Sequence, residues 1–390
     1  MNFGFCVRES PHHGGDLVAL NSLQDGLREL GHRVFIGPDA LSVIKSDYIV
    51  ITNTCLDQSD NFPALKENSK RWGIVTFHED FVKYLPTSEG FVNYAFNAFN
   101  NGKWSYEDEA QRFAITDLDE GGDIVQLFGE GTLPKTSHVN RFLIEGAETV
   151  FAHSDMEKRD ILRHIPDANI EVCRWGCGIA KPNDSYLDSF LKLTGLTKGE
   201  YILSVGRIEG RKNQLASVLA LRDNDTPLVL TTPTIRSKKY ASFVAEVAAL
   251  RKGPTIMISP EFQDNQSGSL RVIGTNGQLL SDDMIISAYQ NAGLHLHPAF
   301  HEMPGYTYLE AAMYNLPQVA SSWGSIDEYF GMGGSETLDG RVKFVAPHHL
   351  GEIRRAVEEQ FGKTFDPLPS HPALTRTNRD IAKDFLKHIK

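Results

Sequence analysis

Short apolar runs alternate with helical repeats along this chain, and the alternation occurs twice. In the first half, apolar runs predict strands at residues 3–7, 33–36, 48–52, 73–77 and 149–152. Apolar residues at helical spacing predict a helix over residues 17–30, between the first two runs. Strands that alternate with helices indicate an α/β fold, in which helices cover both faces of a parallel sheet.

A polar segment at residues 181–185, Lys-Pro-Asn-Asp-Ser, ends the first half, and the same pattern then restarts. Apolar runs predict strands at residues 201–205, 228–231, 255–259, 294–297 and 318–320. Helical repeats lie between or after them, at residues 215–221, 243–250, 285–290 and 309–314. We therefore predict two Rossmann-like, doubly wound domains that face each other, with a short amphipathic helix at the C-terminus, over residues 380–390.

Composition excludes several function classes for this chain of 390 residues. Its formal net charge of −11 argues against a sequence-independent nucleic-acid binder, which needs a basic surface, so no nucleic-acid partner is expected. No apolar run approaches the ~18 residues of a transmembrane helix, which leaves only peripheral membrane contact open. Residues 1–7 lack the charged and long apolar regions of a signal peptide.

Cysteine and histidine spacing argues against disulfide and metal chemistry. The cysteines are few and scattered, at Cys6, Cys55, Cys173 and Cys177. Such usage suits a reducing compartment, and we expect a cytoplasmic protein. The histidines that could suggest a metal lie in separate loops or on one strand, at His12, His13, His295, His297 and His301. Because no His-x3-His pair falls on a predicted helix, no metal site is expected.

Residues 302–310, Glu-Met-Pro-Gly-Tyr-Thr-Tyr-Leu-Glu, place two carboxylates around a tight turn. A predicted strand precedes them, a Pro-Gly pair marks the turn, and the next helix should begin near Tyr306 or Thr307. Free N–H groups in the first turn of such a helix bind phosphate. Glu302 at the strand edge can reach a sugar hydroxyl and Glu310 a ribose, which suits a nucleotide sugar.

Arg207 and Lys212 lie in the loop after the predicted strand 201–205. Ligands of open α/β sheets bind outside the carboxyl ends of the strands, so this loop is at the correct edge. An Arg fork and a Lys point charge both suit the oxygens of a diphosphate. We expect Lys212 to open the next helix. A solvated basic loop is the alternative explanation of the pair.

Two segments of the first half also follow predicted strands. Gly14 and Gly15 come between the first strand and the first helix, where paired glycines let a backbone approach a phosphate or sugar closely. A flexible turn is the simpler explanation of the same pair. His78 follows the run 73–77, with Asp80 two residues further on. A single histidine in such a place is often structural.

The Glu-x7-Glu motif is followed by Ala-Ala-Met-Tyr-Asn-Leu-Pro-Gln-Val-Ala-Ser-Ser at residues 311–322. This combination resembles the donor-site signature of glycosyltransferase family 4, a retaining family with the GT-B fold. The spacing of five residues between Arg207 and Lys212 matches the same family, and the Gly-Gly loop and His78 resemble its N-terminal elements. The resemblance covers most of the chain, and it is specific in the second half.

This resemblance implies a role for each candidate residue. Arg207 and Lys212 would hold the donor diphosphate and take part in catalysis. Glu302 would orient the sugar as a further catalytic residue, while Glu310 would bind the ribose. His78 would lie beside the donor sugar and the reacting carbon. The remaining residues expected at the donor or the cleft are Gly14, Gly15, Gly305, Tyr306 and Thr307.

The chain departs from the family pattern in ways that bear on these expectations. Asn315 stands where the family has a glycine that ends the helix in the left-handed conformation, which Asn adopts next most readily. Met303-Pro304-Gly305 replaces the usual aromatic–Gly pair, and Trp323 stands within a Gly-Gly-x-x-Glu loop. The selectivity for the sugar therefore stays open.

The resemblance also implies an architecture. A GT-B protein has two Rossmann-like, doubly wound parallel-sheet domains facing a central cleft, with a C-terminal helix crossing back to the first domain. The acceptor-side domain would comprise residues 1–182 together with 372–390. The nucleotide-sugar domain would comprise residues 183–371.

The implied activity is retaining transfer of a hexose from a UDP- or GDP-linked donor to a hydroxyl acceptor, in glycan or glycoconjugate synthesis. The acceptor would be a sugar, a lipid-linked molecule or another hydroxyl compound. No cofactor is required beyond the nucleoside-diphosphate sugar, which is the donor substrate. The alternatives are a sugar-nucleotide epimerase of the same fold and a non-catalytic sugar-nucleotide-binding protein. Aromatic residues over 91–104 predict either a helix packed on the core or a platform for the acceptor.

Overall fold

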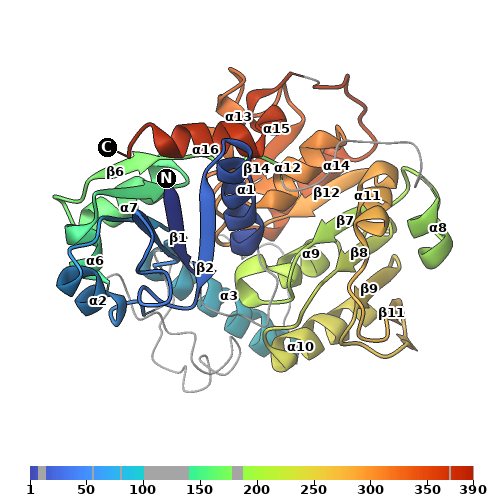
Figure 1. The fold of residues 1–390 in the computed structure, drawn as a ribbon. Helices are drawn as coiled ribbons and strands as arrows, with labels where there is room; N and C mark the ends of the chain where they lie inside the picture. Colours follow the sequence, from blue (N-terminus) through green and yellow to red (C-terminus); the bar gives the residue numbers. More distant parts are fainter. Residues whose placement is uncertain are drawn as a thin grey trace. The chain divides into compact units, whose positions relative to one another are not determined.

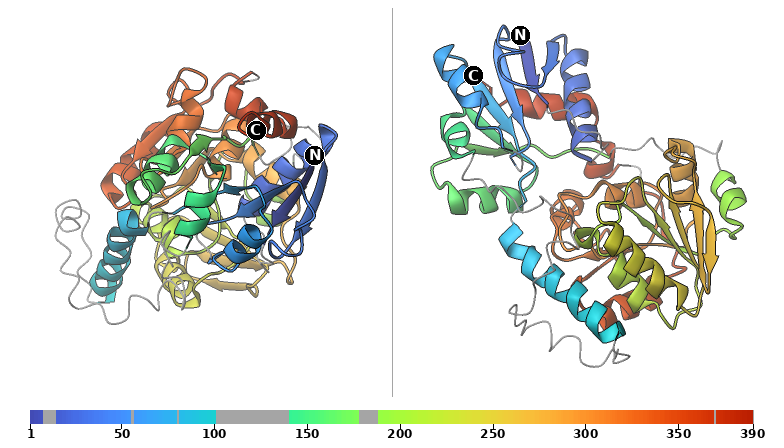
Figure 2. Two further views of the ribbon diagram at one scale, coloured as in Figure 1. Left: turned by 60° about the vertical axis from the view of Figure 1, so that its left-hand side comes forward. Right: turned by 90° about the horizontal axis from the view of Figure 1, so that it is seen from below.

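The computed structural model describes residues 1–7, 15–54, 57–79, 81–100, 140–177, 188–368 and 370–389. Contacts divide the chain into two compact units, one from residues 1–81, 134–178 and 370–390 and one from residues 82–133 and 179–369. Each unit is built around its own sheet with helices on both faces (Figures 1 and 2). The predicted boundary between residues 182 and 183 lies outside the described residues and stays a prediction.

The sheet of the first unit has the strand order β2-β1-β3-β4-β5-β6, and all neighbouring strands run parallel. These strands are β1 (Asn2–Cys6), β2 (Arg33–Gly37), β3 (Tyr48–Thr52), β4 (Trp72–Val75), β5 (Thr149–Ala152) and β6 (Ile170–Val172). The predicted strands of the first half are therefore confirmed, and β6 is additional. It was missed because Ile-Glu-Val is too short to stand out as an apolar run.

Helices cover both faces of this first sheet. One face packs in an apolar cluster against α2 (Asn61–Glu67), α6 (Arg141–Gly146) and α7 (Asp155–His164). The other side carries α1 (Gly15–Glu29) and α16 (Asn378–Leu386), and α15 (Pro372–Thr375) also belongs to this unit. Phe385 of α16 packs against Phe3 and Phe151, with ring centroids 6.0 and 4.4 Å away. The C-terminal helix thus returns to the first unit, as predicted.

The sheet of the second unit has the order β10-β11-β9-β8-β7-β12-β13-β14. Its pairs are parallel except β10 with β11. The strands are β7 (Ile202–Val205), β8 (Leu228–Thr231), β9 (Thr255–Ser259), β10 (Asn265–Ser267), β11 (Leu270–Gly274), β12 (Leu294–His297), β13 (Gln318–Ser321) and β14 (Val342–Val345). The predicted strands of this half are confirmed, while β10, β11 and β14 are additional.

Two layers of helices enclose the second sheet (Figure 1). One apolar cluster joins the sheet to α8 (Ser189–Thr194), α11 (Asp282–Asn291) and α12 (Tyr306–Met313). Further helices of this unit are α3 (Phe81–Asn100), α9 (Gln214–Ala220), α10 (Lys238–Ala249), α13 (Ile326–Gly331) and α14 (Leu350–Gln360). Among these, α9 contacts both α10 and α14, and α14 contacts β12, β13 and β14.

The strand order of the second sheet fixes where a ligand can bind. β7 is the first strand of this unit along the chain, yet it lies centrally, with β8 and β9 on one side and β12, β13 and β14 on the other. The chain therefore reverses direction across the sheet between β7 and β12. Loops diverge at such a switch point and leave a crevice outside the carboxyl ends of the two strands.

Asn315 ends α12 in the predicted way. Its φ is 58°, in the left-handed region, immediately after the C-cap residue Tyr314. Asn is the residue that tolerates this conformation best after Gly, because its short amide can hydrogen-bond locally. The Asn315 carboxamide oxygen accepts a hydrogen bond from Leu368 N at 3.2 Å. The substitution of the family's glycine is therefore structurally conservative.

Helix α3 packs on the second unit through its aromatic residues, and Figure 2 shows the path of this helix. Tyr84 stacks on His301 with ring centroids 5.0 Å apart, and Phe91 lies 5.9 Å from Phe300. Further along α3, Phe96 meets a ring of α10 at 5.1 Å. These contacts support the interpretation of α3 as a packing helix, whereas Trp104 lies outside the described residues. In the part of the chain that the structure describes, no helix is long and apolar enough to cross a membrane.

A glycine-to-alanine pair tests the packing of the C-terminal helix. A Cβ on Gly26 of α1 would lie 1.9 Å from Asn378 O at the start of α16, so Gly26→Ala must separate these two helices. We expect a loss of about 1–3 kcal/mol in the free energy of unfolding. In the control Gly351→Ala, the nearest atom to the new Cβ is 3.8 Å away, and stability should stay equal or rise slightly. Equal urea midpoints for the two variants would contradict this packing.

Candidate functional site

The loop after β7 brings Lys212 toward the switch point. Lys212 ends a 3-10 helix over Gly210–Lys212, and Asn213, at a φ of 60°, separates it from α9. The prediction that Lys212 opens the next helix is therefore wrong, because the tight turn precedes α9. Asn213 Nδ2 donates hydrogen bonds to Pro298 O at 2.8 Å and to Pro347 O at 2.7 Å. These bonds fix the end of the turn against the loop that follows β12.

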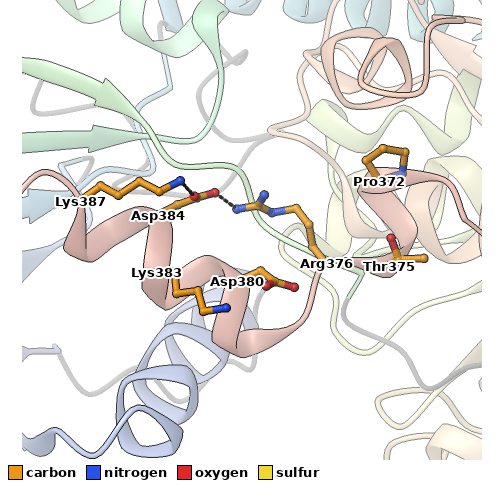
Figure 3. A pocket seen from close by; sticks show the side chains of 7 residues that line it. All are labelled: Pro372, Thr375, Arg376, Asp380, Lys383, Asp384 and Lys387. Atoms are coloured by element: carbon orange, nitrogen blue, oxygen red, sulfur yellow. Dashed lines mark hydrogen bonds and ion pairs between the residues drawn. The ribbon is translucent and has the colours of Figure 1, made fainter.

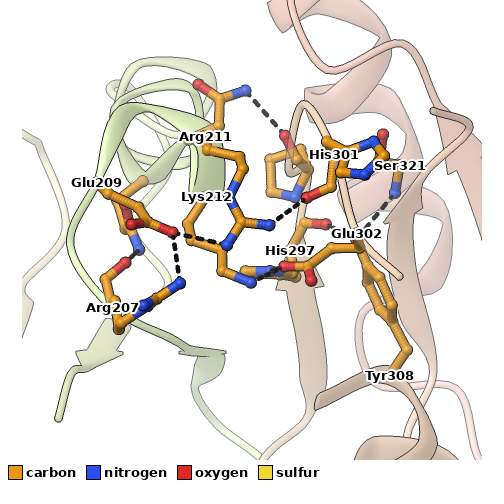
Figure 4. Close-up of polar contacts among 12 residues, drawn as sticks. Arg207, Glu209, Arg211, Lys212, His297, His301, Glu302, Tyr308 and Ser321 are labelled. Carbon is orange, nitrogen blue, oxygen red and sulfur yellow. Dashed lines mark hydrogen bonds and ion pairs between the residues drawn. The ribbon is translucent and has the colours of Figure 1, made fainter. Parts of the chain in front are cut away.

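Glu302 contacts both Lys212 and His297 at the centre of the site (Figure 4). It lies in the loop after β12, as predicted, and its oxygen Oε1 contacts the Lys212 ammonium. The same oxygen lies 2.8 Å from His297 Nε2 at the end of β12. Side-chain exposure is 14% for Lys212 and 6% for Glu302, so the pair is largely withdrawn from water.

Electrostatics explain why this buried pair is stable. Burial alone would raise the pKa of Glu302, but the charge of Lys212 and the hydrogen bond from His297 hold it well below its ordinary value. Burial lowers the pKa of Lys212, and Glu302 opposes that shift. Each charge is therefore tolerated because the other is present. Removing one partner from such a pair leaves an uncompensated buried charge, a costly defect.

Two arginines stand beside this pair and share one acid. Arg207 Nη2 and Arg211 Nη2 lie 3.3 and 3.0 Å from Glu209 Oε1. Arg211 also donates from Nη1 to His301 O at 3.2 Å, which ties the loop after β7 to the loop after β12. The site therefore concentrates three cations with two carboxylates (Figure 4). Sequence reasoning missed Arg211 and Glu209, although both lie inside the segment it had singled out.

The turn between the two motif glutamates is tightly built. Gly305 has a φ of 86°, and a Cβ there would lie 2.7 Å from the Tyr308 ring. Both the backbone conformation and the space thus require glycine. Helix α12 begins at Tyr306, as predicted. Within the described part of the chain, the buried hydroxyl of Thr307 makes no hydrogen bond.

Gly324 follows Trp323 in the loop after β13 and lies against the backbone of Glu302. A Cβ there would be 2.9 Å from Glu302 O. The next residue, Ser325, donates its N–H to the same carbonyl at 3.3 Å. Trp323 turns to aromatic neighbours, with its ring 6.0 Å from Phe300 and 5.4 Å from His348. The loop after β13 therefore helps to hold Glu302 in place.

Glu310 has the opposite electrostatic setting to Glu302. It lies in α12, as predicted, and Tyr289 OH of α11 donates to its Oε2 at 2.8 Å. Burial raises the pKa of Glu310 to about 7. One carboxylate of the motif is thus held ionised, and the other lies close to half-protonation near neutral pH. Environments that separate the pKa values of paired acids are typical of functional sites.

His78 belongs to the first unit and follows β4. Its backbone N–H donates to Glu157 Oε1 at 2.6 Å, and Thr76 Oγ1 donates to the same oxygen at 2.6 Å. The other oxygen of Glu157 accepts from His153 N at 2.5 Å. A fully buried carboxylate of α7 therefore fixes the loop that carries His78. Sequence reasoning missed Glu157, which lies three residues after Ser154, the residue whose side chain caps α7 by accepting from Glu157 N.

The remaining predicted residues of the first half are only partly described. Gly15 is the first residue of α1. Gly14 and Asp80 lie outside the described residues, so their roles stay predictions.

A separate hollow of about 380 Å³ opens beside α15 and α16 (Figure 3). It is lined by Pro372, Thr375, Arg376, Asp380, Lys383, Asp384 and Lys387. Asp384 pairs with Arg376 and also with Lys387, at 2.6 Å in the latter case. The hollow belongs to the first unit, whereas the switch point belongs to the sheet of the second unit.

Comparisons with known proteins identify the fold. No family model matches the chain, and no curated protein matches it by sequence. A sucrose-phosphate synthase from Thermosynechococcus elongatus matches with a TM-score of 0.54 and 12% identity, over 99% of this chain and 93% of its own. An E. coli trehalose-6-phosphate protein bound to UDP-2-fluoro glucose matches with a TM-score of 0.55 and 11% identity, over 99% and 95%.

A third similar structure is the UDP-GlcNAc 2-epimerase of Methanocaldococcus jannaschii. It has a TM-score of 0.51 and 11% identity, over 99% of both chains. At such identities the likeness shows the fold alone. The chain has the GT-B fold, with two parallel-sheet α/β domains, as the sequence predicted.

The raised pKa of Glu310 predicts a pH-dependent stability. Because the pKa in the folded state is about 7 rather than 4.5, its contribution is complete below pH 4.5 and is lost as the pH rises through 7. Glu310→Gln keeps the neutral form and should therefore flatten the stability curve over this window, by up to about 3 kcal/mol.

Urea unfolding at about pH 5 and about pH 8 measures this effect. Glu358→Gln is the matched control, since Glu358 is 54% exposed in a surface pair with Arg354. The free energy of unfolding of the Glu358 variant should depend on pH as it does in the unmodified chain. If the Glu310 variant showed that same pH dependence, the carboxyl of Glu310 would not have the raised pKa.

Proposed function

We propose that the chain is a retaining glycosyltransferase, which moves a hexose from a UDP- or GDP-linked donor to a hydroxyl acceptor. The observation that carries this proposal is the contact of Lys212 with Glu302 at the switch point of the second sheet. A cation for phosphate and an acid for sugar hydroxyls lie side by side at the edge where ligands of such sheets bind. The GT-B fold supports the same function by analogy alone, since proteins with this fold also perform other reactions.

The cations would stabilise the departing diphosphate. When the anomeric C–O bond breaks, the sugar becomes oxocarbenium-like and negative charge accumulates on the leaving phosphate. Lys212 and Arg207 would compensate that charge. Such preorganised electrostatic stabilisation is usually the largest single contribution to catalysis. The buried setting of Lys212 strengthens its effect, because little water screens it.

The two acids would bind different parts of the donor. In the described part of the chain, Glu302 Oε2 accepts no hydrogen bond, whereas Oε1 takes both of the contacts described above. Oε2 is thus the atom that would accept from a sugar hydroxyl. Glu310 would accept from the ribose hydroxyls, which favour its ionised form. The hydroxyl of Thr307 is a further group available to the donor.

Retention fits the residues proposed for the site. A retaining glycosidase holds two carboxyl groups about 5 Å apart as nucleophile and acid. Here Glu302 is committed to Lys212 and His297, and Glu310 lies about one helical turn into α12. In the proposed reaction the acceptor oxygen therefore attacks the anomeric carbon from the same face from which the diphosphate departs. An oxygen of the departing phosphate takes the proton of the acceptor hydroxyl. His78 is proposed, by family resemblance, to lie beside the donor sugar.

An epimerase is the second candidate, since a UDP-GlcNAc 2-epimerase is among the similar structures. Product analysis separates the candidates. A transferase releases the nucleoside diphosphate, whereas an epimerase returns an isomeric sugar nucleotide without net release. A non-catalytic binding protein would do neither, even with donor bound.

The ligand itself can be found with a thermal-shift panel of UDP-, GDP- and ADP-linked sugars. A donor that binds only the folded state stabilises it, by about 2.7 kcal/mol at 100 times its Kd. We expect one nucleotide class to raise the melting temperature clearly more than the others. A panel without any shift would contradict the proposed donor class.

Substitution of the central pair tests the proposed catalysis. Lys212→Ala and Glu302→Ala should each reduce transfer by about 100-fold or more, because each removes an interaction proposed for the transition state. The matched control is Lys252→Ala, since Lys252 forms an exposed pair with Asp225 at 2.7 Å in the same unit. Circular dichroism would establish that all variants are folded. Near-normal turnover in either site variant would remove that residue from the site.

A further inference from the structure

His297 is a buried histidine that the proposed chemistry does not yet use. It ends β12, its side chain is 1% exposed, and its Nε2 lies 2.8 Å from Glu302 Oε1. Burial lowers the pKa of His297, so the ring is neutral and carries a single N–H. A contact of this length with an ionised carboxylate needs a donor, which places the proton on Nε2. His297 is thus a neutral donor to the motif glutamate.

The backbone of His297 is held more firmly than the side chain of Lys212. Tyr308 OH donates to His297 O at 2.5 Å, and Ser321 N of β13 donates to the Tyr308 hydroxyl at 3.4 Å. The Tyr308 ring also meets the imidazole edge at 5.3 Å. Lys212 instead reaches Glu302 along a flexible four-carbon chain, which can turn to another anion.

We propose that His297 is the positioning residue of Glu302, which holds Oε1 when Lys212 turns to the donor diphosphate. This inference rests on the proposed function. The diphosphate competes with Glu302 for the same ammonium group, and its two or more negative charges favour the exchange. Glu302 would then swing freely if Lys212 were its only partner. The hydrogen bond from His297 keeps Oε2 directed at the sugar hydroxyl while the charge partner is lost.

His295 is a matched control within the same strand. Residues i and i+2 of a strand point to the same face, and the two imidazoles stack with centroids 6.0 Å apart. Both are buried, but His295 is hydrogen-bonded to Gln318 at 3.3 Å rather than to Glu302. A general effect of losing a buried imidazole from β12 should therefore be equal at the two positions.

The experiment compares His297→Leu, His297→Gln and His295→Leu by calorimetric titration with UDP and UDP-glucose, or with GDP and GDP-mannose if the guanine nucleotide is preferred. His297→Leu should leave the affinity for the nucleoside diphosphate within about twofold but weaken the affinity for the sugar nucleotide about 10-fold or more, because Glu302 no longer holds the sugar hydroxyl. His297→Gln, which keeps an N–H donor, should recover most of that loss. His295→Leu should match the unmodified chain.

Equal losses in the two leucine variants, or no recovery with glutamine, would overturn the positioning role and leave the proposed function intact. Failure of the unmodified chain to bind any of these nucleotides would instead overturn the proposed function. The contact itself is tested without ligand by ¹⁵N NMR of labelled histidines. The histidine signals that are present in the unmodified chain and absent in His297→Leu belong to His297. We expect them to show a neutral ring protonated at Nε2. A His297 ring protonated at Nδ1 would overturn the inference.

Discussion

The buried contact between Lys212 and Glu302 is the interaction on which the rest of the site depends. The two residues lie on loops that follow β7 and β12, which pair directly through Ile202 with Leu294 and Leu203 with His295. Without a ligand, each of these buried charges is stabilised by the other, so the fold must bring both loops to one place. The hydrogen bonds from Asn213 and Arg211 across the same two loops show how the backbone secures that meeting.

This arrangement gives the site a graded set of charges. Glu302 is held ionised by its neighbours, Glu310 lies near half-protonation in its less polar surroundings, and His297 is a neutral donor. The donor that we propose, a nucleotide sugar, has a strongly charged diphosphate and several neutral hydroxyls, and each would meet a partner of suitable charge in the proposed site. The charge state of each side chain thus depends on whether a neighbouring group offsets the effect of burial on its pKa.

Local sequence patterns predicted the parts of the fold that depend on local physics. The bounds of β3, β8 and β12 and the start of α12 at Tyr306 follow from apolar runs and turn residues, whereas the left-handed Asn315 was expected from the family resemblance. Periodicity could not predict contacts between distant segments. It therefore missed Glu157, whose partners Thr76 and His78 follow another strand, and Arg211, whose partner His301 lies in the loop after β12. Those partners are determined by strand order, which no single segment encodes.

The central claim is that Lys212 and Glu302 are energetically coupled within the folded chain. A double-mutant cycle with Lys212→Met, Glu302→Gln and the combined variant, followed by urea unfolding without ligand, measures this coupling directly. We predict that the double variant is more stable than the sum of the single changes implies, by about 1–3 kcal/mol, because each single change leaves a buried charge uncompensated. Additive effects within about 0.5 kcal/mol would contradict the claim, since independent sites behave in that way.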